Sequence, residues 1–268
     1  DPHLVVNDTS EPDWAGSRVS PPLRYPERVT AVNGQPVRDH AEFAALLASQ
    51  QVGDTIAVTV VQPTDALVAA DAQRPLTRTL NFSLTTFTNA DKWNHFWLLY
   101  LTGLVTLAVG VWAFWLRPEA EPAQIFALLM ATGSVGIGGL FDLMTTQWVT
   151  AVWVVAMPLN AVWLVWLAGV FPYETRLFTA VPRLKPVLLA VGLLVGAWGL
   201  WWLFAPPDPW AYALPWRAAY FYNGLAALAA LGIMAYRGVQ SPSPRVRQQG
   251  WLMLGGTALA FSPVGTFF

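Results

Sequence analysis

The chain has 268 residues, of which 55% are hydrophobic and 12% charged, and its formal net charge is −1. It contains no cysteine, which excludes disulfides, thiolate metal sites and cysteine nucleophiles, and it lacks the basic stripe typical of nucleic-acid-binding proteins. Residues 1–92 hold 7 Lys or Arg and 11 Asp or Glu, whereas residues 93–268 hold 8 and 5. The composition therefore predicts a mildly acidic soluble head followed by a mildly basic, apolar body.

Residues 28–37 predict a β-hairpin, because apolar and polar residues alternate on both sides of Asn33 and Gly34. Asn-Gly tolerates positive φ at both positions, which favours a tight two-residue turn between antiparallel strands.

A helix and two further strands are expected after this hairpin. Residues 39–49 have helical periodicity, with Asp39 placed as the N-cap. Its expected apolar face consists of Phe43, Leu46 and Leu47. The β-branched run at 55–61 and the alternating residues 76–84 predict the two strands.

The phrase RVTAVNGQPV at 28–37, followed by a helix and by GDTIAVTVVQ at 53–62, resembles the second half of a bacterial PDZ domain. The resemblance implies a small α/β PDZ-like domain over residues 1–90. PDZ domains capture peptide C-termini by strand addition beside a glycine-rich carboxylate loop, and residues 10–27 contain no such loop. A PDZ-like fold that does not bind peptide is therefore expected; a working peptide groove and a different small α/β fold are the alternatives.

Residues 91–268 are expected to form an α-helical polytopic membrane bundle. Long stretches without Asp, Glu, Lys or Arg approach the roughly 20 apolar residues that a helix needs to cross the hydrocarbon layer. Tryptophan is frequent near their ends, as expected at the membrane interface. The six expected spans are about 93–116, 122–144, 148–171, 186–205, 216–236 and 249–268.

The loop charges predict the orientation of these spans. The loops after the first, third and fifth spans hold seven basic residues: Arg117, Arg176, Arg183, Lys185, Arg237, Arg245 and Arg247. The loops after the second and fourth spans hold none, and Arg217 lies just inside the fifth span. The positive-inside rule then places the odd loops in the cytoplasm and the head outside the inner (plasma) membrane of a bacterium. We also expect a signal peptide or membrane helix before residue 1 and more chain after residue 268.

Histidine is too sparse for the intramembrane hydrolases that carry a PDZ-like domain. A zinc protease needs two His one helical turn apart with a Glu between them, but the three histidines, His3, His40 and His95, are scattered. A rhomboid-like serine protease needs a Gly-x-Ser partner that His95 lacks. An interfacial role for His95 is the main expectation, with haem or chlorin ligation as the alternative. We therefore expect no catalytic, metal or cofactor site within residues 1–268.

Polar residues inside the spans are costly in lipid and are therefore candidate sites. Asp142 and Arg217 fall at similar depth near the outer face, where they could form an ion pair; the alternative is that each lies in headgroup water. Asn160 and Asn223 are expected to form interhelical hydrogen bonds, and Pro158 could instead form a signal-transmitting kink. Glycines that repeat every three or four residues predict close helix approach: Gly133, Gly136 and Gly139, and Gly192, Gly196 and Gly199.

The segment PRVRQQGWLMLG at 244–255 resembles the R-x-Q-x-R-W-x-x-x-G phrase of multispan bacterial sensor histidine kinases, the family of the competence-pheromone receptors. The residues that match are Arg247, Gln248, Gln249 and Trp251, whereas Gly250 stands where that phrase has its second Arg. The family also has a PDZ-like extracytoplasmic segment, and a cytoplasmic ATP-binding region that residues 1–268 lack. Independently of the resemblance, Arg245 and Arg247 suit anionic headgroups.

The resemblance implies the sensory input module of a two-component signalling kinase, with the catalytic part outside this chain. The expected partners are the lipid bilayer, a second copy or other membrane subunits, and an unknown extracellular ligand, but no nucleic acid. The alternative is a non-catalytic accessory subunit of a larger photosynthetic or respiratory membrane complex. A transporter fragment would need inverted repeats and buried charges at mid-membrane, and neither is found.

Overall fold

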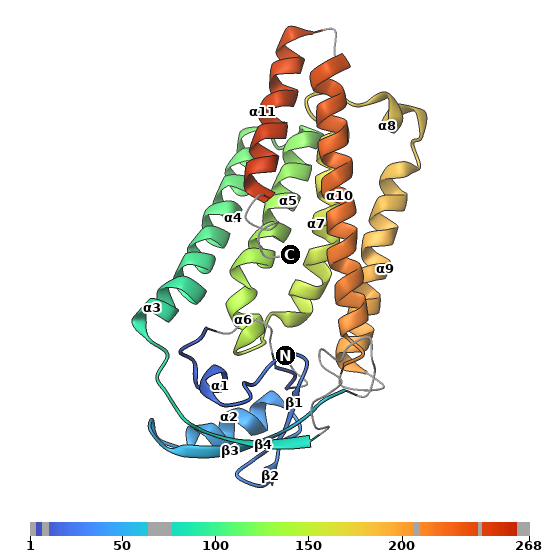
Figure 1. Ribbon diagram of the computed structural model, residues 1–268. Coiled ribbons are helices and arrows are strands. Elements are labelled where there is room, and N and C mark those ends of the chain that lie inside the picture. Colours follow the sequence, from blue (N-terminus) through green and yellow to red (C-terminus); the bar gives the residue numbers. More distant parts are fainter. Residues whose placement is uncertain (1–3, 7–10, 64–76, 206–209, 241–242, 262–268) are drawn as a thin grey trace. The chain divides into compact units, whose positions relative to one another are not determined.

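The computed structural model describes residues 4–6, 11–63, 77–205, 210–240 and 243–261 (Figure 1). The chain divides into two compact units. We call one the head unit; it comprises Asp1–Tyr100, Gly139–Ala151 and Trp201–Leu214. The other, the helical unit, comprises Leu101–Gly138, Val152–Leu200 and Pro215–Phe268.

The predicted hairpin is confirmed. Strand β1 (Arg28–Val32) pairs with β2 (Gln35–Pro36) in antiparallel register, with Val32 opposite Gln35. The two turn residues, Asn33 and Gly34, have φ of 49° and 78°. The Asn33 side chain also accepts a 2.8 Å hydrogen bond from the backbone N–H of Ala57, so the turn is fastened to the next strand.

The predicted helix and strands are confirmed within one residue of their expected ends. Asp39 caps α2 (His40–Ala48) by accepting a 2.9 Å hydrogen bond from the backbone N–H of Glu42. Strands β3 (Thr55–Val61) and β4 (Thr77–Ser83) complete an antiparallel sheet of order β2-β1-β3-β4.

The core of the head lies between this sheet and α2. Alternate residues of β3 are buried, as period-2 alternation requires, and they form a cluster with residues of β1 and β4. The three apolar residues predicted for the helix face, Phe43, Leu46 and Leu47, pack against that cluster. The head is thus a small antiparallel α/β fold, and its PDZ-like character stays a prediction.

Five helical stretches are long and apolar enough to cross a membrane, which is compatible with a multi-pass membrane protein. They are Asn89–Leu116, Glu121–Met144, Thr150–Val170, Leu184–Phe204 and Ala213–Gln240. They correspond to the first five predicted spans. Their elements are α3 (Asn89–Asp91), the π-helical turn η1 (Lys92–Trp97), α4 (Leu98–Leu116), α5 (Glu121–Gly138), α6 (Leu140–Met144), α7 (Thr150–Val170), α9 (Leu184–Phe204) and α10 (Ala213–Gln240).

Two of these stretches differ in detail from the prediction. The first begins four residues early, because Thr88 and Asp91 form a capping box that starts the helix before the apolar run. The second is interrupted at Gly139, which lies between the last residue of α5, Gly138, and the short α6. Glycine has the weakest helix propensity after proline, so a break there is inexpensive.

The sixth predicted span is described only in part. Helix α11 (Pro244–Phe261) begins five residues before the expected start, and residues 262–268 lie outside the described residues. Two short helices, α1 (Ala15–Arg18) and α8 (Arg176–Ala180), complete the elements.

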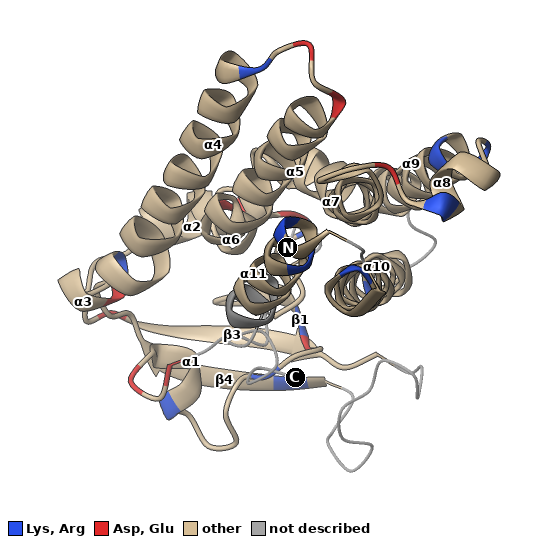
Figure 2. Cartoon of the chain, turned by 90° about the horizontal axis from the view of Figure 1, so that it is seen from above, with Lys and Arg blue, Asp and Glu red and all other residues tan. Residues whose placement is uncertain are grey.

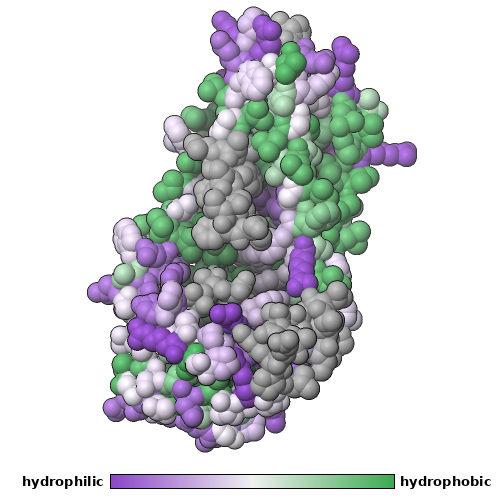
Figure 3. Space-filling model, in the orientation of Figure 1, coloured by the Kyte–Doolittle hydropathy of each residue, from purple (hydrophilic) through white to green (hydrophobic). Residues whose placement is uncertain are grey.

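Helix α7 is the central helix of the helical unit. In the most apolar 18 residues of α7, 56% are buried, compared with 11–22% in the corresponding segments of the other four stretches. Those four expose large apolar side chains such as Val105, Leu194 and Leu228. Figure 3 shows these helices with hydrophobic sides and a hydrophilic end near α8 and the start of α11. Such a surface suits contact with lipid.

Glycines allow α9 to pack closely on α7. A Cβ on Gly192 would lie 2.5 Å from the Val162 side chain, and one on Gly199 would lie 2.5 Å from that of Val154. This row of glycines is therefore a packing surface, as the sequence predicts.

Candidate functional site

Trp210, three residues before α10, contacts the segment of Pro26 within the head unit. Trp210 Nε1 donates a 2.8 Å hydrogen bond to the carbonyl oxygen of Pro26. Pro26 is fully buried, and Tyr212 is 5% exposed. Burial raises the pKa of the Tyr212 hydroxyl, and Tyr25 shifts it in the same direction. We call Pro26, Trp210 and Tyr212 the head dock.

A buried ion pair fixes the loop that carries Pro26. Arg78, on β4, donates from Nε and Nη2 to the two carboxylate oxygens of Glu27, each at 2.7 Å. The same guanidinium donates to the carbonyl oxygens of Pro21 and Pro22 at 2.8 and 2.7 Å. Glu27 is fully buried. A bidentate Arg–carboxylate pair fixes geometry well, so the acceptor of Trp210 is held by the sheet itself.

An aromatic cluster surrounds the start of the first span. It consists of Trp14, Phe87, His95, Phe96 and Phe141, with ring centroids 5.1–6.1 Å apart between neighbours. Because Phe141 belongs to α6, the cluster connects the end of the second span with η1 and the head segment around Trp14.

Polar contacts reinforce this aromatic cluster. His95 Nε2 lies 3.5 Å from Glu11 Oε1, and Trp14 Nε1 donates to Asp91 Oδ1 at 3.4 Å. His95 thus contributes packing and one polar contact at the base of the head. His40 begins α2, whereas His3 lies outside the described residues.

Asp142 organises the turn that leads into α7. Its carboxylate accepts hydrogen bonds from the Thr146 hydroxyl and from the backbone N–H groups of Trp148 and Val149, the latter two at 3.1 and 2.9 Å. Arg217 lies on α10 in the helical unit, whereas Asp142 belongs to the head unit. Their predicted ion pair stays a prediction.

The two asparagines predicted to lie inside the spans both form hydrogen bonds between helices. Asn160 Nδ2 donates to the Leu129 carbonyl and the Thr132 hydroxyl of α5, each at 3.3 Å. Asn223 Nδ2 donates to the Met157 carbonyl of α7 at 2.8 Å. That carbonyl directly precedes Pro158, which is fully buried inside α7. A signalling role for this proline stays a prediction.

The helices α10 and α11 pack at their closest around two glycines. A Cβ on Gly250 would lie 3.1 Å from the Gly238 backbone nitrogen and 3.2 Å from the Met234 carbonyl oxygen. A larger side chain such as arginine therefore does not fit at position 250 without moving a helix. Trp251 packs over Gly238 and is half exposed.

Basic residues gather at one end of the helical unit. Figure 2 shows Lys and Arg at the ends of α4 and α10, about α8 and at the start of α11. Arg245 and Arg247 are exposed on the first turn of α11. This end contains the seven basic residues that the sequence assigns to the cytoplasm.

Two charged features at this end were not predicted from the sequence. Lys185 Nζ lies 2.7 Å from Glu121 and 3.0 Å from Glu174, and Trp166 Nε1 also donates to Glu121. These contacts connect α5, α7 and α9. The only sign of these contacts in the sequence is that Glu121 and Glu174 lie in or beside the loops that contain basic residues.

The second unpredicted feature is a buried guanidinium. Arg237 is 3% exposed, and its Nη2 donates to the carbonyl oxygens of Gly169, at 3.0 Å, and Tyr173. The sequence predicts that Arg237 lies in a loop, whereas α10 continues past it to Gln240.

The described residues contain no group of three or more His, Cys, Asp or Glu arranged to hold a metal ion. The contacts above connect structural elements to one another. Among known proteins, no family model, curated protein or solved structure matches this chain. The PDZ-like and sensor-kinase resemblances therefore depend on the quoted residues alone.

Proposed function

We propose that this chain is the sensory input module of a bacterial two-component signalling kinase, whose catalytic part lies outside residues 1–268. In this proposal the chain crosses the inner membrane several times, with the PDZ-like head outside and the arginine-bearing loops in the cytoplasm. The distribution of basic residues supports this orientation. The two resemblances support the kinase family.

The head dock is the observation that carries the proposal. The ion pair between Glu27 and Arg78 fixes the loop of Pro26, and Pro26 accepts the hydrogen bond of Trp210. Three residues beyond Trp210 the chain enters α10, which leads to α11. A change in the head therefore has a direct covalent and hydrogen-bonded route to the helices that precede residue 268.

A signal would act by favouring one of two arrangements of this dock. A ligand shifts a two-state equilibrium only by its differential affinity for the two states. In this proposal the ligand binds the head more tightly in one of two states, with the Trp210 hydrogen bond either formed or broken. Binding would therefore change the position of α10. A second copy of the chain is the expected partner for the output.

The test uses the gene product in its native host. We expect the full-length protein to continue beyond residue 268 into a dimerisation helix and an ATP-binding region, and to autophosphorylate in membranes supplied with labelled ATP. Trp210→Phe should change basal autophosphorylation several-fold, whereas Trp148→Phe, at a tryptophan that is 88% exposed, should not.

The alternative function is an accessory subunit of a larger membrane complex. The wide apolar surface of the peripheral helices, with Trp112 61% exposed and Trp115 79% exposed, favours contact with other membrane subunits as well as lipid. Stoichiometric co-purification with pigmented or redox subunits, together with a chain that ends near Phe268, would replace the sensor proposal with this one.

A further inference from the structure

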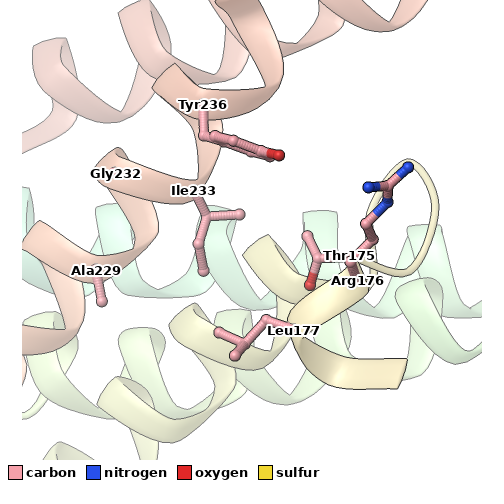
Figure 4. Close-up of a pocket in the computed structure, with 7 residues that line it drawn as sticks. All are labelled: Thr175, Arg176, Leu177, Ala229, Gly232, Ile233 and Tyr236. Carbon is pink, nitrogen blue, oxygen red and sulfur yellow. The ribbon is translucent and has the colours of Figure 1, made fainter. Parts of the chain in front are cut away.

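A cavity of about 380 Å³ opens between α8 and α10 (Figure 4). One wall is the start of α8, and the other is formed by the last turns of α10. The residues that line it are Thr175, Arg176, Leu177, Ala229, Gly232, Ile233 and Tyr236. All belong to the helical unit, and the volume falls in the range of known ligand sites, about 300–1,000 Å³.

The cavity has a polar end and an apolar end. In Figure 4 the Arg176 guanidinium and the Tyr236 hydroxyl lie at one end, whereas Leu177 and Ala229 lie at the other. Tyr236 and Ala229 are separated by seven residues of α10, about 10 Å at a rise of 1.5 Å per residue. The lining therefore suits an elongated molecule with a polar head and an apolar tail.

The polar end is positively charged. Among the described residues, the exposed guanidinium of Arg176 forms no ion pair. The nearby acid, Glu174, lies 3.0 Å from Lys185, which compensates its charge. The potential at this end therefore favours an anion.

One buried polar atom of the cavity wall, Thr175 Oγ1, has no hydrogen-bond partner among the described residues. Thr175 precedes α8, but its side chain makes no cap hydrogen bond to that helix. Buried polar atoms usually have partners, so the cavity wall keeps one hydroxyl that the protein itself does not satisfy.

We propose that this cavity binds one anionic phospholipid, with the phosphate at Arg176 and an acyl chain along Leu177, Ala229 and Ile233. The polar end coincides with the basic end of the helical unit, where α10 leaves its apolar segment, so the headgroup would lie at the membrane surface. Leu177 and Tyr236 are 54% and 57% exposed, so the cavity opens to the side. This inference depends on the membrane placement of the helices and is independent of the signalling role.

Gly232 provides a substitution that fills the apolar part. A Cβ on Gly232 would meet no atom within 4 Å, so Gly232→Leu should occupy the cavity without displacing the backbone. Gly224, two turns earlier on the same helix, has the same open surroundings but does not line the cavity. Gly224→Leu is therefore the matched control, since both changes raise helix propensity.

The experiment is native mass spectrometry of the purified full chain in detergent. The protein is titrated with phosphatidylglycerol, with phosphatidylcholine of the same acyl chains, and with inorganic phosphate. We expect a one-to-one phosphatidylglycerol adduct at concentrations where phosphatidylcholine and phosphate give none. Arg176→Gln should weaken that adduct about fivefold, from roughly 1 kcal/mol per basic residue at the surface. Gly232→Leu should weaken it at least about tenfold, because two or three methylene contacts are lost.

The controls decide whether the adduct reports this cavity. Arg183→Gln removes an exposed arginine of the same loop region and should leave the affinity unchanged, as should Gly224→Leu. Equal binding of the two lipids would overturn the proposal. So would a control that weakens binding as much as the variant it is matched with, namely Arg183→Gln against Arg176→Gln or Gly224→Leu against Gly232→Leu. Competition by inorganic phosphate would identify a free-anion site instead. A change of oligomeric state in Gly232→Leu, with lipid binding intact, would identify a helix-docking surface and also overturn it.

Discussion

The indole Nε1 of Trp210 donates a 2.8 Å hydrogen bond to the carbonyl oxygen of Pro26, although 184 residues separate them in the chain. The bond joins the loop between α9 and α10 to a segment fixed by the sheet. It therefore connects the segment of Pro26 to the residues that directly precede α10.

Trp210→Phe should loosen this connection while leaving the rest of the head intact. The aromatic volume largely stays, but the buried Pro26 carbonyl loses its donor, at a cost of about 1–3 kcal/mol. Hydrogen exchange should become faster for the amides of residues 210–216 and stay unchanged in β3. Trp148→Phe is the control, and equal protection in both variants would show that the bond does not hold the loop.

Glu27→Gln should destabilise the head strongly. The change is nearly isosteric but leaves the buried guanidinium of Arg78 without its carboxylate, and breaking a buried pair typically costs about 3–5 kcal/mol. Denaturant-dependent hydrogen exchange of the β1 and β3 amides in the full chain measures the loss. Asp13→Asn, at an exposed acid, should change nothing. If Glu27→Gln lowered the free energy of unfolding by less than about 1 kcal/mol, water would be replacing the carboxylate beside the Arg78 guanidinium, and the argument would be wrong.

Arg237→Lys should destabilise the last turns of α10 even though the charge is kept. Arg237 Nη2 donates to two carbonyl oxygens, of Gly169 and Tyr173, and the guanidinium lies 5.1 Å from the Tyr173 ring centroid. Lysine has a shorter side chain and no planar group to stack on the ring, so its ammonium replaces these contacts poorly. The expected loss is about 1.5–3 kcal/mol, measured by thermal unfolding in detergent. Arg247→Lys, at an exposed arginine, is the control; the same melting temperature in both variants would contradict the argument.

Gly250→Ala should move α11 away from α10. The added Cβ would lie 3.1–3.3 Å from the backbone of α10, and overpacking of this kind costs about 1–3 kcal/mol. Gly255→Ala, on the same helix with open space around it, should be neutral or stabilising. Distances between spin labels on the two helices should increase in the first variant alone. An unchanged distance distribution would show that the helices accommodate a side chain at this point.

Local patterns predicted the elements well, because their causes are local. The Asn33-Gly34 turn, the Asp39 cap and the alternation of β3 each depend on residues within a few positions of one another. The five apolar spans follow from composition, since a helix that crosses lipid must be apolar over its whole length.

Contacts between distant residues could not be predicted in this way. Glu27 and Arg78 are 51 positions apart and look like ordinary surface charges in the sequence. The cavity between α8 and α10 requires the relative placement of two helices, which periodicity does not give. Asp142 illustrates the same limit: its carboxylate organises its own turn, a role that depends on the break at Gly139.

Cysteine accessibility in intact cells tests the membrane arrangement most directly, because the chain contains no native cysteine. Single cysteines replace exposed residues in the head (Gln35→Cys), in the turn after the second span (Trp148→Cys) and in the loop after the first span (Glu119→Cys). We expect a membrane-impermeant maleimide to label the first two variants in whole cells and the third only after lysis. Labelling of Glu119→Cys from outside, with protection of Gln35→Cys, would place the head in the cytoplasm and contradict the sensory proposal.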